Sequence, residues 1–549
     1  MSSLHPNDLS QEMKPEENGR EAKNVAPAIA GKASPPQFMT GLKLLLACFA
    51  FLLSTFLSSL DQSIVSTAIP AMVSRFQALD QVTWIPGAYF LTQAGLVLTA
   101  GQLLTVFPPK YVYVCSIAIF ECGSLVCAVA QSMTALIVGR AIAGCGAAAM
   151  FTSVSTIDAE IIPLDKRPIL FGSFGVVVAL AVVLGPLLGG VLTDRVSWRW
   201  CFYINLPLGA LAIILVFFVL ERREPRNKDS QLLVSSPWIR LGFVDWVGSV
   251  VCMSMVVALL LPLQWGGITK SWRDVQVVAL FSLSAVLFVL LAIWEWRRRE
   301  TALVPLGMLR RRSQFGATFS VFFIGLGLFV GVYYLPLWFQ AKGHSATKSG
   351  VDILPFMISV VVSSGVTAGI VTKLGRYWWI IVVSPLIFSV GSGLLFTLDT
   401  TSPTKRVIGY QILAGIGLGG NLQNVFLAIH AEWAHEPHMI PQAVALCSFM
   451  QLTGGTLGIP IAGTIFRNKL KDYLAAYASE ISEEALQAVQ QSVDAIFTLP
   501  IPVQELVISA YIRSLNHVFL LGIPAGILAC IFSAMTKNYN LKTRTKERP

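Results

Sequence analysis

The sequence predicts an all-α membrane protein whose chain crosses the bilayer fourteen times. Hydrophobic residues make up 54% of the 549 residues and charged residues only 13%, whereas a soluble chain carries roughly a quarter charged residues. Because a charged side chain is unfavourable in hydrocarbon, this deficit indicates that much of the surface faces lipid. Long apolar runs recur along the chain, and a helix needs about 20 apolar residues to cross the hydrocarbon.

The fourteen predicted spans are mostly separated by short connections. The second, fifth, ninth and thirteenth spans contain no Asp, Glu, Lys or Arg. The weakest predictions are the fourth span, which contains Arg140, and the seventh, which begins near Asp245. In chain order the spans lie near residues 42–72, 84–107, 111–130, 134–158, 168–193, 199–220, 244–265, 274–296, 314–341, 350–372, 377–398, 405–431, 441–466 and 516–536.

The distribution of Lys and Arg predicts that both ends of the chain lie in the cytoplasm, because cytoplasmic loops of membrane proteins carry an excess of these residues. With the N-terminus inside, cytoplasmic segments hold 26 of the 40 Lys and Arg residues, outer segments hold 13, and Arg140 lies in the membrane. This topology accounts for the net charge of +10. It leaves no basic face interleaved with aromatic residues, so we expect a lipid bilayer and no nucleic acid as a partner.

Two short sequence patterns repeat at matching positions in the two halves of the chain. Gly144 and Gly146 follow Arg140 in the fourth span, and Gly415 and Gly417 follow Gln411 at the same offsets in the twelfth. A Pro-x-x-Gly pattern likewise occurs in the fifth span and, at nearly the same offset, in the thirteenth. Transporter folds are often built from duplicated halves. The repeat therefore predicts two parallel six-helix halves, spans 1–6 and 9–14, with two helices inserted between them.

This organisation divides the chain into seven predicted parts. Residues 1–40 are polar and proline-containing, which is typical of a disordered tail. The long outer loop 467–515 is predicted to form a surface helix or two, with a structural or lid role left open. The parts are a cytoplasmic tail (1–40), the first half (41–220), a basic loop (221–243), the inserted helices (244–296), a second basic loop (297–313), the second half with its outer loop (314–536), and a basic cytoplasmic tail (537–549).

Four motifs resemble those of the major facilitator superfamily, within it the fourteen-spanner drug:proton antiporter family. Leu60–Pro70 (LDQSIVSTAIP) is similar to its first-helix signature, and Gly139–Gly146 (GRAIAGCG) to its fourth-helix arginine motif. Gly185–Gly190 (GPLLGG) resembles its antiporter motif, in which glycines allow close helix contact and proline kinks the helix. Trp198–Pro207 (WRWCFYINLP) is similar to the fungal branch, which includes exporters of mycotoxins and other secondary metabolites.

The resemblance and the repeat together assign a set of residues to conformational change. One departure from the family concerns the loop after the second span, which usually carries an Asp before a basic run. Here Gly101–Lys110 has no acid, and its second copy, Gly369–Arg376, has none either, so the sequence does not support a gate built on that Asp. The expected conformational residues are Gly144, Gly146, Gly185, Pro186, Gly189, Gly190, Gly415, Gly417 and Pro460.

Four ionisable residues are candidates for proton coupling, since an ionisable side chain within a membrane span suggests function. Asp61 is expected to bind and release protons, although a carboxylate near a helix end needs no function. Arg140 is expected either to hold Asp61 ionised in one state or to be a structural cation bonded to carbonyl groups. Glu121 is expected to be a structural or lipid-facing carboxyl group, and Asp158 to contribute to closing the cytoplasmic end.

Aromatic and amide side chains are candidates for contact with a ligand. Such faces suit a large, weakly polar, aromatic compound; the alternative is that many of these residues belong to the interfacial belts, especially Trp338. The candidates are Tyr89, Gln93, Asn205, Tyr333, Tyr334, Gln411, Asn421, Gln423, Asn424 and Gln451.

The expected function is export of small hydrophobic compounds such as toxins, drugs or secondary metabolites, in exchange for protons, by alternating access. Alternatives are an importer of siderophores or basic amino acids and, from another class, a membrane-embedded enzyme or receptor. A primary pump is not supported because there is no Walker A sequence. His430, His435 and His438 are interpreted as part of a solvated loop, so no metal, cofactor or enzymatic activity is expected. We expect a monomer in the plasma membrane, the vacuolar membrane being the alternative.

Overall fold

The computed structural model describes most of the chain and is helical almost throughout. The one bridge between extended segments in the described residues joins Gly266 and Lys270. The predicted tail 1–40 lies almost entirely outside the described residues. These residues are 38–78, 81, 84–225, 236–266, 270–475, 489 and 493–546.

The predicted number of spans is confirmed. Within the described ranges, fourteen helices are long and apolar enough to cross a membrane. The two weakest predictions both form spans: Arg140 lies inside the fourth, and Asp245 caps the N-terminus of the seventh by accepting a hydrogen bond from the Gly248 backbone N–H at 2.9 Å. Such a cap satisfies a backbone donor that a helix start would otherwise leave unpaired.

The first half contains six spans, of which the sixth is interrupted at Ile204 by a break between two helices. Pro109 and Pro168 lie in the first turns of the third and fifth helices, where no intrahelical N–H bond is lost. The helices are α1 (Gly41–Phe76), α2 (Trp84–Val106), α3 (Pro109–Val129), α4 (Met133–Ile161), α5 (Arg167–Arg195), α6 (Trp200–Tyr203) and α7 (Asn205–Val219).

Two inserted helices follow, and they lie against one side of the bundle. Helix α10 packs on α2 and also contacts α18 of the second half, whereas α11 packs mainly on α10 and exposes most of its apolar side chains. Short helices flank the pair. In order these elements are α9 (Pro237–Leu241), α10 (Trp246–Trp265), α11 (Val275–Arg298), η2 (Arg299–Thr301) and η3 (Leu306–Arg310).

The second half repeats the six-span pattern with longer helices near its end. Helix α18 continues to Ala475 and α20 begins at Ile501, so both extend into the predicted outer loop 467–515, much of whose remainder lies outside the described residues. The elements are α12 (Arg312–Ala341), α13 (Ala346–Asp352), α14 (Leu354–Leu374), α15 (Trp378–Phe396), α16 (Thr404–Leu422), α17 (Asn424–Glu432), η4 (Pro437–Met439), α18 (Ile440–Ala475), η5 (Asp494–Thr498), α20 (Ile501–Phe519), α21 (Gly522–Ala534) and α22 (Leu541–Lys546).

Helix packing shows the internal repeat directly. In the first half α1 packs on α5, α2 on α4, and α3 on α4 and α7; in the second half α12 packs on α18, α14 on α16, and α15 on α16 and α21. The two halves meet where α5 packs on α14 and where α2 packs on α18. The glycines of the two repeated patterns make corresponding contacts. Gly144 and Gly146 approach α2 and α3 so closely that a Cβ atom would overlap them, and Gly415 and Gly417 approach α14 and α15 in the same way.

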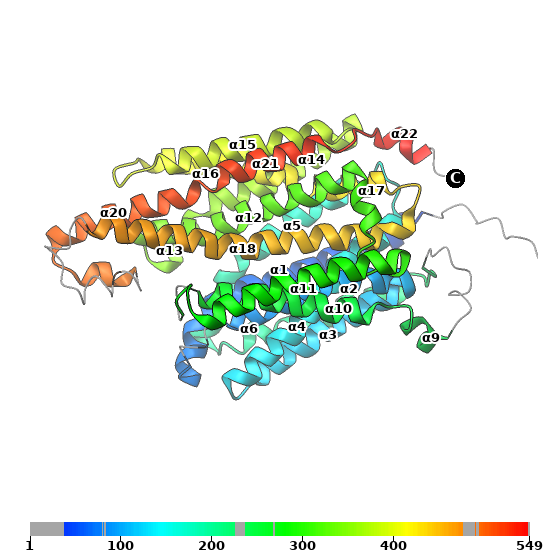
Figure 1. The fold of residues 1–549 in the computed structure, drawn as a ribbon, viewed down its shortest axis with the longest axis horizontal. Coiled ribbons are helices and arrows are strands. Elements are labelled where there is room, and N and C mark those ends of the chain that lie inside the picture. The colour runs from blue at the N-terminus through cyan, green and yellow to red at the C-terminus, as the bar shows by residue number, and fades with distance from the viewer. Residues whose placement is uncertain are drawn as a thin grey trace, which may run out of the picture. The chain divides into compact units, whose positions relative to one another are not determined.

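The two ends of the described chain lie at the same end of the bundle, called the terminal end below (Figure 1). The backbone N–H of Met39 donates to Ile161 at the end of α4, and Thr545 in α22 donates to Asp165 in the loop that follows α4. The other end is called the distal end. Because the spans alternate in direction, α1 starts at the terminal end and α2 at the distal end.

The hydrophobic core joins the two halves at the terminal end. One buried cluster there contains Val154 and Phe171 of the first half together with Phe426 and Val444 of the second. Toward the distal end lie two further clusters, and the buried members of each come from a single half. The halves therefore share a packed core at the terminal end and have separate cores toward the distal end.

Candidate functional site

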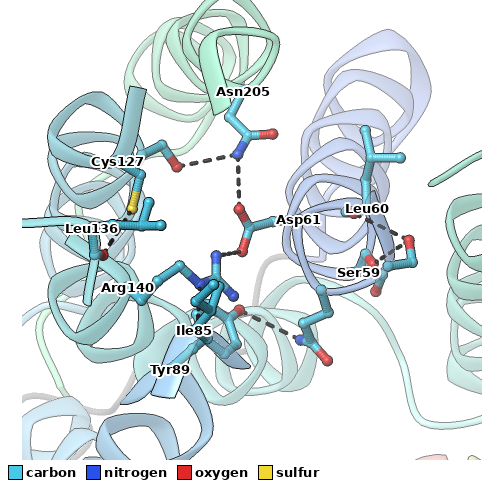
Figure 2. Close-up of polar contacts among 12 residues, drawn as sticks. Ser59, Leu60, Asp61, Ile85, Tyr89, Cys127, Leu136, Arg140 and Asn205 are labelled. Atoms are coloured by element: carbon cyan, nitrogen blue, oxygen red, sulfur yellow. Dashed lines mark hydrogen bonds and ion pairs between the residues drawn. The ribbon is translucent and has the colours of Figure 1, made fainter. Parts of the chain in front are cut away.

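A buried ion pair between Asp61 and Arg140 forms the centre of the candidate site. Asp61 on α1 has no exposed surface and Arg140 on α4 exposes 2% of its surface. The Arg140 Nη1 atom lies 2.5 Å from Asp61 Oδ2, and Arg140 Nε donates to the backbone carbonyl of Ile85 at 3.1 Å. Figure 2 shows the two side chains directed toward each other across the space between their helices. Arg140 therefore contacts both Asp61 and a backbone carbonyl, and its role in proton coupling stays a prediction.

Asn205 completes the hydrogen bonding of Asp61 from the opposite side (Figure 2). Its Nδ2 atom donates to Asp61 Oδ1 at 3.2 Å and to Ser124 Oγ on α3 at 3.1 Å. Asn205 is the first residue of α7, directly after the break that separates α6 from α7. Two helices besides α1, namely α4 and α7, therefore supply the direct partners of the carboxylate, and α3 bonds Asn205.

Aromatic rings cover the guanidinium group of Arg140. Its Cζ atom lies 4.5 Å from the ring centroid of Tyr89 and 6.0 Å from that of Phe202. A cation over an aromatic face is attracted by the negative face of the ring. The Tyr89 hydroxyl in turn accepts a hydrogen bond from Gln62 Nε2 at 3.4 Å. Tyr89, a ligand candidate from the sequence, thus belongs to the ion-pair network and is fully buried.

This geometry suggests how the charge on Asp61 could be linked to the positions of α1 and α4. Removing one partner of a buried ion pair leaves an uncompensated charge, which costs about 3–5 kcal/mol. Protonation of Asp61 has the same effect on Arg140, because it removes the charge that compensates the guanidinium. The Asp61–Arg140 pair therefore joins α1 and α4 through one pair of opposite charges.

Glu121, the third ionisable candidate, lies buried between α3 and α7 and does not face lipid. It exposes 9% of its surface, and neither of its carboxyl oxygens has a hydrogen-bond partner in the described structure. A Cβ atom on Gly209 of α7 would lie 1.9 Å from Glu121 Oε1, so only glycine at this position leaves room for the carboxyl group.

Asp158, the fourth ionisable candidate, lies in the last turn of α4 at the terminal end. It is fully buried and neither of its carboxyl oxygens has a hydrogen-bond partner in the described residues. Beside it on α4, Ser155 contacts His430 of the second half, whose Nε2 atom lies 2.9 Å from Ser155 Oγ. The His430 Nδ1 atom lies 3.1 Å from Arg167 Nη1 on α5. These contacts join the two halves.

The interpretation of His430 as part of a solvated loop is wrong. The residue is fully buried because α17 carries it into the contact between the two halves, where its ring also meets Phe171 edge-on at 5.2 Å. The described residues contain no group of three or more His, Cys, Asp or Glu side chains that could hold a metal ion.

The glycine–proline motif of α5 packs against α1, the helix that carries Asp61. A Cβ atom on Gly185 would lie 2.0 Å from Ser63 Oγ, and one on Gly189 would lie 2.5 Å from the Ile64 carbonyl oxygen. Gly190 differs, because a Cβ atom there would meet no atom within 4 Å. Pro186 lies inside α5 between these contacts, and Pro460 lies inside α18, its counterpart in the second half.

A backbone segment that follows the inserted helices is bonded to both halves at the terminal end. Gln102 on α2 donates to the Thr301 carbonyl at 3.0 Å. Gln442 on α18 donates to the Ala302 and Leu303 carbonyls at 3.1 and 3.3 Å. Residues 301–303, called the strap below, thus bridge α2 and α18. This bridge lies beside the acid-free loop Gly101–Lys110, and it is formed by the neutral amide groups of Gln102 and Gln442.

The ligand candidates from the sequence are dispersed. Several are bonded within the second half: Tyr334 donates to the Ile459 carbonyl, Asn421 to the Ile381 carbonyl and Asn424 to Thr367. Amide atoms of Gln93, Gln411 and Gln423 are buried without hydrogen-bond partners among the described residues. Gln451 is partly buried, and its backbone packs on Gly325.

Of the aromatic candidates, Tyr333 is the accessible one. It exposes 46% of its surface and stacks on Phe329 with ring centroids 6.5 Å apart. Phe329 of α12 in turn meets Phe90 of α2 at 5.9 Å, so aromatic rings of the two halves touch here. Trp338, which could have been an interfacial residue, is buried and donates to Asn516 Oδ1 at 3.1 Å.

Sequence reasoning missed the contacts that join the halves. Gln102, Gln442 and Ser155 are ordinary polar residues in apolar runs, and their partners are distant along the chain. For His430 the sequence did contain an indication of burial, because the residue lies within the apolar run of the twelfth span. Its placement next to two other histidines favoured the loop interpretation.

The comparisons with known proteins agree on one family. Residues 51–459 match the family model "Major Facilitator Superfamily". The chain is 40% identical over 433 residues to the MFS-type efflux pump MFS1 of Arthroderma benhamiae, covering 79% of this chain and 80% of the relative.

A second relative and a solved structure extend this likeness. The chain is 35% identical over 496 residues to the Aspyridones efflux protein of Neocamarosporium betae, covering 90% of this chain and 86% of the relative. The crystal structure of the human organic anion transporter MFSD10 (TETRAN) is similar in fold, with a TM-score of 0.55 at 12% identity, covering 89% of this chain and all of that one.

Proposed function

The chain belongs to the Major Facilitator Superfamily, and we propose that it exports small hydrophobic compounds in exchange for protons. It is an integral membrane protein, and its family is one of transporters rather than enzymes. The observation that carries the proton coupling is the buried Asp61–Arg140 pair, which connects two helices through one titratable charge.

The proposed cycle couples protonation of Asp61 to movement of the two halves. In the first state of this cycle Asp61 is deprotonated and keeps the contacts with Arg140 and Asn205 that the described structure has. A proton that enters from outside neutralises Asp61 and releases Arg140 from it. The close contacts of Gly185 and Gly189 transmit the resulting shift of α1 to α5, which in turn packs on α14 of the second half.

In this cycle the described structure is the state closed toward the cytoplasm. The terminal end is the cytoplasmic end in the topology that the Lys and Arg residues favour. At that end the halves share a buried core and the His430 contacts. Alternating access requires this seal to open while the distal ends of the halves come together.

The relatives support export and a hydrophobic substrate. One is named an efflux pump, and another is named for the efflux of aspyridones. In this chain the accessible ring of Tyr333, with Phe329 and Phe90, offers an apolar surface shared by both halves. Aromatic rings bind flat apolar ligands through burial and stacking. We therefore propose that lipophilic secondary metabolites bind at this surface.

The partners and location follow from the same proposal. A carrier of this kind works as a single chain, because one chain contains both of the six-helix halves that move in the cycle. We propose that it acts as a monomer in the plasma membrane, where export removes a toxic compound from the cell. Both ends of the chain then lie in the cytoplasm.

The test is transport by the purified protein in liposomes with an imposed pH gradient. Aspyridones and the lipophilic dye rhodamine 6G are offered as substrates, and Asp61→Asn is compared with Asp399→Asn, a change of an acid outside the spans. We expect proton-driven movement by the wild type and by Asp399→Asn, and none by Asp61→Asn. Full coupled transport by Asp61→Asn contradicts the role of Asp61; a wild type that moves neither compound contradicts the proposed function.

A further inference from the structure

A second carboxyl group lies in the same helix groove as the Asp61 site. Ser124 on α3 contacts Asn205 on α7, and one turn away Glu121 on α3 faces Gly209 on α7. Residues 121 and 124 are separated by about 4.5 Å along the helix axis, at 1.5 Å per residue. Since α3 runs from the terminal end to the distal end, Glu121 lies on the terminal side of the Asp61 network.

The surroundings of Glu121 do not compensate a negative charge. Both carboxyl oxygens are buried without hydrogen-bond partners in the described structure. Among the titratable groups of the described residues, Asp61 on α1 is the one whose charge acts on Glu121, and the sequence of α7 has no titratable residue. Arg140 is already bonded to Asp61. An ionised carboxylate that is buried without a partner is strongly unfavourable, so Glu121 holds a proton in this state.

The site therefore contains two carboxyl groups and a single guanidinium group. The charge of Asp61 acts on Glu121, and groups that interact electrostatically exchange protons as a coupled set rather than independently. When Asp61 is ionised and bonded to Arg140, Glu121 must be neutral. When Asp61 takes up a proton, the like charge that opposes an ionised Glu121 is removed.

We propose that Glu121 is a second proton-carrying residue of the transport cycle, on the terminal side of Asp61. The inference rests on the proposed function and deepens it. A proton that binds Asp61 from outside removes the like charge that acts on Glu121, and the Glu121 proton is then released toward the cytoplasm. The O–H bond of the Glu121 carboxyl group breaks and water takes the proton. The proton held by Asp61 then passes to the Glu121 carboxylate and restores both groups, so that one proton crosses in each cycle. Gly209 is the positioning residue, because any side chain there would displace the carboxyl group.

The first experiment needs no substrate. Infrared difference spectra of the purified full-length protein in lipid are recorded while the pH is raised, and the carbonyl band of a protonated carboxylic acid is followed. We expect a band that Glu121→Gln removes, that declines as pH rises, and whose midpoint moves in Asp61→Asn. A Glu121 band that stays unchanged with pH, or a spectrum that Glu121→Gln leaves unchanged, overturns the proposal.

The second experiment measures the number of protons exchanged per substrate in liposomes with the membrane potential clamped at zero. With rhodamine 6G as substrate and a pH difference of one unit, exchange of one proton per substrate permits an accumulation of about 10-fold, whereas movement without proton coupling permits none. We expect Glu121→Gln to lower the limiting accumulation by about 10-fold, and Glu121→Asp to retain more of it than Glu121→Gln. Unchanged accumulation in Glu121→Gln overturns the proposal.

Controls separate folding from proton transfer. Gly209→Ala changes no titratable group but displaces the carboxyl group, so we expect it to move the infrared band and lower the accumulation ratio. Asp399→Asn should change neither. If the wild type shows no gradient-driven transport, the proposed function fails, whereas a coupled wild type with an unaltered Glu121→Gln variant refutes only the role of Glu121.

Discussion

At the scale of residues, Arg140 makes two kinds of contact. It compensates the charge of Asp61, and it bonds the Ile85 carbonyl and contacts the Tyr89 ring. A buried ion pair is weak support for stability by itself, because each charge has lost its hydration. The pair therefore matters more for function than for folding.

Arg140→Ala should destabilise the protein more than the double variant Asp61→Asn with Arg140→Gln. The single change leaves an unpaired buried carboxylate, at a cost of about 3–5 kcal/mol, while the double change removes both charges. Thermal unfolding in detergent measures the difference. We expect the double variant to fold nearly as well as the wild type and to lack proton-driven transport. Equal unfolding temperatures for Arg140→Ala and the wild type would contradict the charge argument.

At the scale of elements, α1 and α5 form one closely packed unit through glycines. Small residues allow helix backbones to approach, and van der Waals contact then holds helices together in lipid. Two neighbouring glycines of the α5 motif can be compared directly, because Gly189 lies against α1 while Gly190 does not.

Gly189→Ala should impair transport and stability, whereas Gly190→Ala should change little. The added methyl group at 189 overlaps Thr67 Oγ1 and the Ile64 carbonyl, and such overpacking costs about 1–3 kcal/mol. A surface change of the kind made at 190 stays within about 0.5 kcal/mol. The two variants are compared by unfolding temperature and initial transport rate, and equal effects would show that the α1–α5 contact is not limiting.

The strap, which follows the inserted helices, links the two halves of the bundle. Glutamines of α2 and α18 bond its backbone from opposite halves, and each net hydrogen bond contributes about 0.5–1.5 kcal/mol. The strap should therefore favour the state closed at the terminal end.

Gln442→Leu should raise the population open at the terminal end by about 3- to 10-fold. A cysteine placed at Val154 in the shared core, in a chain without its native cysteines, is labelled with a membrane-impermeant maleimide from the terminal side. Gln504→Leu is the matched control, because Gln504 bonds the Phe497 and Leu499 carbonyls within one half. Equal labelling of Gln442→Leu and the control would exclude the strap from gating.

For the whole molecule, the proposed cycle requires the shared core at the terminal end to separate once in each turn. Helices α5 and α14 form one of its two seams, and Gly365 lies on that seam near Val176. A Cβ atom at Gly365 would lie 3.9 Å from Val176 Cγ2, so side chains at these two positions meet across the seam.

Val176→Cys with Gly365→Cys should lock the protein when oxidised. We expect transport to stop on oxidation and to return with dithiothreitol, while either single variant stays active throughout. Transport by a fully cross-linked protein would show that this seam does not open. The experiment tests alternating access without assuming which ion is coupled.

The fourteen helices and the two repeated halves were predictable from the sequence, because span length and repeated glycine patterns are local properties. Asp61 and Arg140 were also predictable as candidates, since a charge within an apolar run is visible without a structure. The interpretation of Glu121 could not be completed in this way, because its environment depends on Gly209, 88 positions later along the chain.

The tertiary structure alone decided which polar groups meet and which end of the molecule is closed. His430 looked like a loop residue until α17 placed it between Ser155 and Arg167 of the other half. The strap joins glutamines that no sequence pattern relates. Contacts between the halves depend on how the two helix bundles pack together, and the hydrophobic pattern of each helix specifies burial but not its partner.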